Sequence, residues 1–124
     1  MSNEKNFTLK GRLQSFSFAW QGLKSFLKTE HNGWIQVLVA LSAVVAGMVF
    51  EISLSQWGLL ALGIGMVLTA EVFNTAIELL TDLVSPEWNE KAKKVKDMSA
   101  AAVLLASITS LVIGAVIFIP KMIA

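Results

Sequence analysis

Three long apolar stretches, separated by short polar segments, occupy most of the chain after residue 33. They cover residues 34–50, 57–84 and 98–119. Each reaches or approaches the roughly 20 apolar residues that a helix needs to cross a hydrocarbon core. The pattern therefore predicts three transmembrane helices, of which the first is short and the second is interrupted by polar side chains.

The region before these stretches has a different pattern. Between residues 7 and 29, large apolar side chains recur every three to four positions and so form one helix face. The Lys and Arg residues lie outside this face. This spacing is typical of an amphipathic helix that lies on a membrane surface instead of crossing it. We expect such a helix at 7–29. Its apolar face holds Leu13, Phe16, Trp20, Leu23 and Leu27.

The third apolar stretch belongs to a longer predicted helix. Ser85, Pro86 and Glu87 supply an N-cap, a first-position proline and a first-turn acid, which together favour a helix start. No further helix breaker follows until Pro120. We therefore predict one helix over 86–119, about 50 Å long, whose first turns stand outside the membrane.

The distribution of charge indicates the orientation. Five Lys and Arg residues precede residue 29 and four lie between residues 91 and 96, whereas residues 51–56 contain none. The positive-inside rule therefore places the N-terminus and residues 85–97 in the cytoplasm. Hydrophobic residues make up 55% of the chain and charged residues 15%. We expect residues 1–124 to form a single membrane domain of the all-α class.

Several kinds of chemistry are excluded. The chain has no cysteine, and His31 is its one histidine, so one copy can form neither a disulfide framework nor a multi-histidine metal site. The sequence also lacks a P-loop, a kinase-type Gly-rich loop and zinc-ligand spacing, which excludes the soluble kinase folds on motif grounds. We expect no nucleic-acid partner.

A stripe of polar side chains interrupts the second apolar stretch. Glu71, Asn74, Glu78 and Asp82 follow one another at spacings of three and four, which at about 100° per residue places them on one helix face. Ionisable groups inside a span are expensive and indicate a functional site by default. A structural alternative is a polar seam that joins helices across an oligomer axis. Another is a non-catalytic membrane assembly or small transporter subunit, in which the stripe lines a polar path.

Depth in the membrane assigns different chemistry to the carboxylates. Counted from Trp57, Glu71 lies about 21 Å along the helix, within the hydrocarbon, and Glu78 lies about 31 Å along it, at the cytoplasmic boundary. Glu30 reaches the level of Glu78 from the other direction. Because Mg²⁺ prefers one or two carboxylates plus phosphate oxygens, Glu30 and Glu78 could hold it with a polyphosphate. Glu71 is placed to accept a proton from a lipid hydroxyl.

The same residues resemble a known family signature. The small prokaryotic diacylglycerol kinases and undecaprenol kinases share a polar block within a span and a second block at the start of the following one. The resemblance extends from about residue 15 to residue 120. Its blocks in this chain read Glu71-x-x-Asn74-Thr75-Ala76-Ile77-Glu78-x-x-x-Asp82 and Lys96-Asp97-x-x-Ala100-Ala101-Ala102-Val103.

The resemblance implies a homotrimer of three-span subunits in the bacterial cytoplasmic (inner) membrane, with active sites between neighbouring subunits at the cytoplasmic face. The reaction would transfer the ATP γ-phosphoryl group to a lipid hydroxyl. Glu71 would be the general base, Asn74 would position the reacting groups, and Glu30 and Glu78 would hold Mg²⁺. The nucleotide candidates are Phe18, Glu30, Glu78, Asp82, Glu87, Trp88, Asn89, Lys96 and Asp97. The lipid-substrate candidates are Arg12, Ser15, Trp20, Glu71 and Ala100.

The chain departs from the family pattern at a few positions. Phe18 stands where many members carry tyrosine, so a hydroxyl contact to the nucleotide is lost there. Gly33, Trp34 and Gln36 also differ from the usual residues after Glu30, in the region expected to meet the lipid head group. The resemblance leaves the lipid open between diacylglycerol and undecaprenol. The loop at 83–88 and the ending at 118–121 look closer to the undecaprenol branch.

Overall fold

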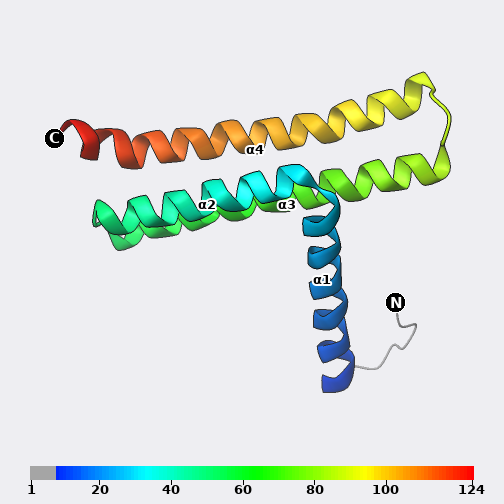
Figure 1. The fold of residues 1–124 in the computed structure, drawn as a ribbon, viewed down its shortest axis with the longest axis horizontal. Coiled ribbons are helices and arrows are strands. Elements are labelled where there is room, and N and C mark those ends of the chain that lie inside the picture. Colours follow the sequence, from blue (N-terminus) through cyan, green and yellow to red (C-terminus); the bar gives the residue numbers. More distant parts are fainter. Residues whose placement is uncertain (1–7) are drawn as a thin grey trace.

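The structure is a computed structural model that describes residues 8–124. These residues form four helices, α1 (Leu9–Thr29), α2 (His31–Val49), α3 (Leu54–Val84) and α4 (Glu90–Ile123), with no strand among them. Helices α2, α3 and α4 lie side by side in alternating directions, and α1 runs across that direction from one end of α2 (Figure 1). The all-α class is confirmed.

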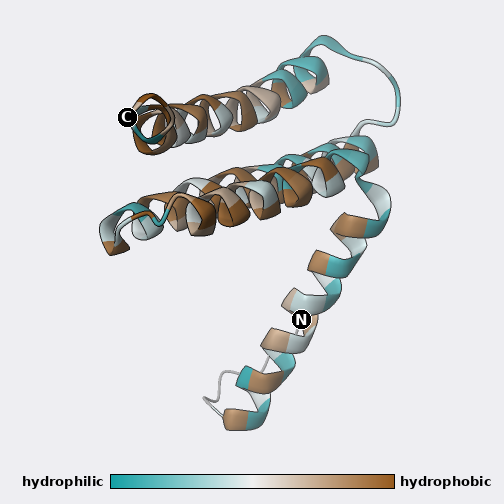
Figure 2. Ribbon diagram, turned by 60° about the vertical axis from the view of Figure 1, so that its left-hand side comes forward, coloured by the Kyte–Doolittle hydropathy of each residue, from teal (hydrophilic) through white to brown (hydrophobic). Residues whose placement is uncertain are grey.

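Three of the helices can cross a membrane. By length and composition, α2, α3 and α4 are each long and apolar enough to span a bilayer. Apolar residues predominate along these three helices except near the α3–α4 loop, where the ribbon turns hydrophilic, whereas α1 alternates apolar and polar positions along its length (Figure 2). The buried core is small, with Ile52, Leu60 and Ile117 at its centre, because lipid instead of protein covers most of the outward-facing side chains. The protein is therefore a membrane protein with three spans.

The junction between α1 and α2 fixes the position of Glu30. Thr8 caps α1 by accepting a hydrogen bond from the Gly11 amide at 3.0 Å. Glu30 then adopts extended backbone angles and serves as the C-cap of α1 and the N-cap of α2. The two helices meet closely because Phe26 packs over Gly33, where a Cβ atom would lie 2.8 Å from the Phe26 ring. Helix α2 begins at His31, three residues before the predicted position.

A tight turn joins α2 to α3 at the opposite end. Glu51 adopts a φ of 51°, in the left-handed region. Ser53 and Gln56 then form a reciprocal capping box that starts α3 at Leu54, three residues before the predicted start. Such boxes satisfy two otherwise unpaired backbone donors. The turn places α2 and α3 side by side, so that Gln36 and Glu71 meet across them.

The start of α4 corrects a sequence-based boundary. The predicted helix at 86–119 begins instead at Glu90, and it continues past Pro120 to Ile123. The Ser85 amide donates to the Thr81 carbonyl, which makes Ser85 the end of α3. Asn89 takes the capping role, since its Oδ1 accepts a hydrogen bond from the Ala92 amide at 2.8 Å. The Ser-Pro-Glu sequence therefore lies in the connecting loop.

Candidate functional site

Helix α3 carries the polar stripe from the buried interior to the exposed surface. Glu71 is 3% exposed, Asn74 and Glu78 are half-buried, and Asp82 is exposed. Because the four residues are spaced three or four apart on an unbroken helix, they share one face. The stripe therefore runs over about 16 Å of helix, from Glu71 to Asp82 in the last turn of α3.

Glu71 lies where α2 and α3 meet. The side-chain amide of Gln36 on α2 hydrogen-bonds to its carboxylate, and the charges of Glu30 and Glu78 also act on it. Its Oε1 atom is buried and receives no hydrogen bond from any group in residues 8–124. A buried oxygen without a donor is costly, so Oε1 is available for a substrate hydroxyl.

Asn74 faces the other neighbour of α3. The buried hydroxyl of Ser99 on α4 donates to Asn74 Oδ1 at 2.7 Å. The stripe thus contacts α2 through Glu71 and α4 through Asn74. The contact with α2 orients the Glu71 side chain, and the contact with α4 orients the Asn74 side chain.

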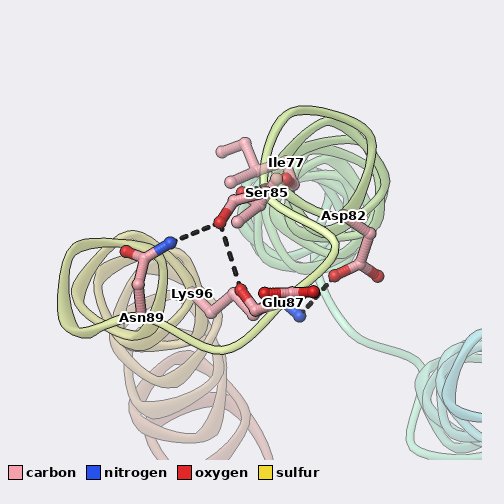
Figure 3. Close-up of polar contacts among 7 residues, drawn as sticks. Ile77, Asp82, Ser85, Glu87, Asn89 and Lys96 are labelled. Atoms are coloured by element: carbon pink, nitrogen blue, oxygen red, sulfur yellow. Dashed lines mark hydrogen bonds and ion pairs between the residues drawn. The ribbon is translucent and has the colours of Figure 1, made fainter.

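Lys96 and Asp82 form an ion pair at the end of the stripe. Lys96 Nζ donates to Asp82 Oδ1 at 2.6 Å, with side chains 41% and 62% exposed, and the pair bridges the facing ends of α3 and α4 (Figure 3). This hydrogen bond raises the pKa of Lys96 above its ordinary value. The Lys96 ammonium therefore stays charged. Because an exposed pair of this kind contributes little to stability, a phosphate can displace the carboxylate at little cost.

The α3–α4 loop contains three predicted nucleotide residues with different surroundings. The Ser85 hydroxyl contacts the Glu87 carbonyl oxygen and the Asn89 amide (Figure 3). Asn89 is also the N-cap of α4, so its side chain is engaged in shaping the loop. Trp88 is 79% exposed and offers a flat apolar surface. Beyond the loop, Asp97 pairs with Lys93 at 2.6 Å.

The candidates on α1 are not gathered with the stripe. Arg12, Ser15, Phe18 and Trp20 are exposed on the part of α1 that runs away from the other helices (Figures 1 and 2). The Ser15 hydroxyl donates to the carbonyl of Gly11 in its own helix at 3.1 Å. The Trp20 ring lies 5.8 Å from Lys24 Nζ. Within one subunit these residues lie outside the site.

The carboxylates of Glu30 and Glu78 could bind a metal ion only if a bound phosphate and water supplied further ligands. No group of three or more acidic or histidine side chains in residues 8–124 could hold a metal ion by itself. Glu30 and Glu78 both act on Glu71, and neither forms an ion pair with a cation in the described part of the chain. Two unpaired carboxylates suit a Mg²⁺ ion that takes its remaining ligands from phosphate and water.

Comparison with known proteins identifies the family. A family model described as prokaryotic diacylglycerol kinase matches residues 17–118. The chain belongs to this family. It is therefore a member of a lipid kinase family, and the resemblance read from the polar motifs is confirmed.

Curated relatives of the kinase cover most of the chain. Undecaprenol kinase of Bacillus subtilis is 34% identical over 109 residues, which are 88% of this chain and 89% of the relative. Diacylglycerol kinase of Synechocystis is 32% identical over 113 residues, 90% of this chain and 65% of the relative. Diacylglycerol kinase of Escherichia coli is 28% identical over 100 residues, 81% of this chain and 82% of the relative.

Two polar contacts of the kinase were missed by the sequence reasoning. In the sequence, Gln36 stands out only as a departure from the family pattern, and Ser99 lies at an unassigned position of the second block. The missed signal is that each is a polar residue on a span facing the stripe, where a polar side chain seeks a partner. Ser99 also follows Lys96 by three residues, and that spacing places both on one face of α4.

Proposed function

We propose that this kinase transfers the γ-phosphoryl group of ATP to the primary hydroxyl of a membrane lipid, with Glu71 as the general base. The observation that carries the proposal is the buried Oε1 of Glu71, which has no donor in residues 8–124. A lipid hydroxyl can fill that gap by donating to Oε1. Gln36 holds the carboxylate from the α2 side and so keeps Oε1 aimed at the acceptor.

In the proposed reaction the lipid hydroxyl loses its proton and gains the phosphoryl group. As the lipid oxygen attacks the γ-phosphorus, its proton passes to Glu71 and the bond to the β-phosphate oxygen breaks, which leaves ADP and a phosphorylated lipid. General-base assistance of this kind typically contributes 10²–10⁴-fold in rate. Asn74, half-buried beside Glu71 on α3, positions the reacting groups.

The polar end of the stripe is the proposed nucleotide site. Glu30 and Glu78 would hold Mg²⁺ together with phosphate oxygens, and the ion would supply charge neutralisation to the polyphosphate. Lys96 contacts a phosphate after leaving Asp82. Asp82, Asp97 and the loop residues Glu87, Trp88 and Asn89 surround the rest of the nucleotide, with Trp88 exposed enough to stack on the base.

We propose undecaprenol as the lipid. Supporting this choice, the undecaprenol kinase of B. subtilis matches 88% of this chain at 34% identity, and the 83–88 loop and the chain ending resemble that branch. The diacylglycerol kinase of E. coli matches 81% of the chain at 28% identity. Both lipids present a primary hydroxyl at the interface, so the chemistry at Glu71 is the same for either.

The proposed assembly is a homotrimer in the bacterial cytoplasmic membrane, with the N-terminus and the α3–α4 loop in the cytoplasm. Lysine-rich segments at both places support this orientation. In a trimer, a neighbouring subunit could bring the α1 candidates Arg12, Ser15, Phe18 and Trp20 to the stripe of the next. Ala100, exposed on α4 beside Ser99, would then face the acceptor lipid.

A side-by-side lipid assay tests the function. The full chain in bilayer vesicles is given ATP labelled in the γ-position, with undecaprenol, with diacylglycerol or with no acceptor. We expect labelled lipid product with an acceptor and none without, and faster turnover on undecaprenol. Faster turnover on diacylglycerol would overturn the lipid assignment. ATP-independent movement of a solute, with no labelled lipid in any arm, would instead support a transporter.

A further inference from the structure

The Ser99 hydroxyl donates to a side chain of a neighbouring helix instead of to its own helix. The hydroxyls of Ser15, Ser42 and Thr109 each donate to a carbonyl four residues earlier in their own helix, which is the common pattern. Ser99 is 6% exposed and donates across the helix pair to Asn74 Oδ1 at 2.7 Å. Its proton is therefore committed to the stripe.

The contact determines which end of the Asn74 amide faces α4. A carboxamide has an accepting oxygen on one side and a donating NH₂ on the other. Because a serine hydroxyl has one proton, its donation to Oδ1 turns the oxygen toward α4 and the NH₂ away from it. Within residues 8–124 the Asn74 side chain forms no second hydrogen bond. Its NH₂ therefore remains free to donate to a phosphate or lipid oxygen.

We propose that Ser99 is a positioning residue of the kinase, which holds the Asn74 amide in the orientation that presents Nδ2 to the reacting oxygens. Without the hydroxyl, the amide can turn over and present Oδ1, which would repel those oxygens instead of binding them. The inference rests on the proposed function, since it needs Asn74 to act on the substrates. Asn74 and Ser99 also line a common open groove of about 580 Å³ between α3 and α4, which leaves the amide room to turn.

The chain contains a matched control. Ser110 lies about three turns further along α4, near the same face, and its hydroxyl donates to the Gly63 carbonyl on α3 at 2.7 Å. Ser99→Ala and Ser110→Ala thus each remove one hydroxyl and one hydrogen bond between α3 and α4. Only Ser99 touches the stripe, so a purely structural role predicts equal effects of the two substitutions.

The experiment measures kcat, KM for ATP and KM for lipid in vesicles, with the thermal unfolding of each variant. We expect Ser99→Ala to lower kcat about tenfold, which equals the loss of about 1.4 kcal/mol of transition-state stabilisation, while KM for ATP stays within about twofold. Ser110→Ala should keep kcat within about twofold. Ser99→Thr retains a hydroxyl and should recover most of the rate.

A double-mutant cycle provides the decisive readout. In an Asn74→Ala background, Ser99→Ala should lower kcat no further, because the amide that it orients is gone. Additive losses, or equal kcat in Ser99→Ala and Ser110→Ala, would overturn the positioning role while the kinase function stands. Failure of the Ser99→Ala variant to assemble, when Ser110→Ala assembles, would also overturn it in favour of a structural role. A wild-type protein that phosphorylates neither lipid would overturn the proposed function and this inference together.

Discussion

Gly33→Ala should disturb the proposed metal site from a distance, through the junction of α1 and α2. An added Cβ at this position would lie 2.8 Å and 2.9 Å from two carbon atoms of the Phe26 ring, closer than side-chain carbons approach. Phe26 is 4% exposed and is the buried residue of α1, so the ring has little room to give. Overpacking of this kind costs about 1–3 kcal/mol.

The strain should reach Glu30, because the Gly33 amide donates to the Glu30 carbonyl at 3.1 Å. We therefore expect Gly33→Ala to lower the thermal unfolding temperature and to raise the Mg²⁺ concentration that half-saturates activity. Both are measured in vesicles by a melting curve and a Mg²⁺ titration. Gly22→Ala on α1 is the control, since apart from the adjoining backbone of α1 no atom of residues 8–124 lies within 4 Å of its added Cβ.

A second variant isolates the cause. Phe26→Leu shortens the side chain that the new methyl group meets, so the double variant should be more stable and more active than Gly33→Ala alone. If Gly33→Ala behaves like Gly22→Ala in both stability and Mg²⁺ dependence, the proposed link between helix packing and Glu30 is wrong.

Three further outcomes are expected at the polar end of the stripe. Glu78→Gln should weaken Mg²⁺ binding and partly recover at high Mg²⁺, and a Mg²⁺ titration that leaves its residual rate unchanged would argue against a metal role. Lys96→Met should raise KM for ATP several-fold with a smaller effect on KM for lipid, measured by separate substrate titrations. Because the hydrogen bond to Asp82 raises the pKa of Lys96, its charge is present at all lower pH and is lost only when pH rises through that raised value. The KM for ATP should therefore not increase between about pH 7 and pH 9 through loss of this charge, and Asp82→Asn should leave that result intact.

The spans and the polar stripe could be predicted because each depends on one segment of sequence. A run of apolar residues long enough for a bilayer indicates a helix whatever it packs against, and the spacing of Glu71, Asn74 and Glu78 fixes their common face. The position of Glu30 near the stripe could also be anticipated, because counting residues along the first and second spans places Glu30 and Glu78 at the same membrane depth. The charge of Glu30 acts on Glu71, and a shared site for the two residues stays a prediction.

Contacts between helices could not be predicted in the same way. The partners of Gln36 and Ser99 depend on how α2 and α4 are rotated against α3, which no local pattern specifies. The start of α4 was misplaced for a related reason. Ser85 and Asn89 are both good caps, and the choice is made by α3, which continues to Ser85 and uses its amide. The arrangement of α1 relative to the stripe involves neighbouring subunits in the proposed trimer.

The central claim is that Glu71 takes the proton of the lipid hydroxyl. Its most direct test is the single-turnover rate of phosphoryl transfer to undecaprenol by Glu71→Gln in vesicles at saturating ATP and Mg²⁺. Glu51→Gln is the control, since Glu51 lies in the turn at the opposite end of the helices. We predict a loss of about 10²–10⁴-fold in Glu71→Gln, with unchanged assembly in detergent and a normal rate in Glu51→Gln. A near-normal rate in Glu71→Gln would contradict the account.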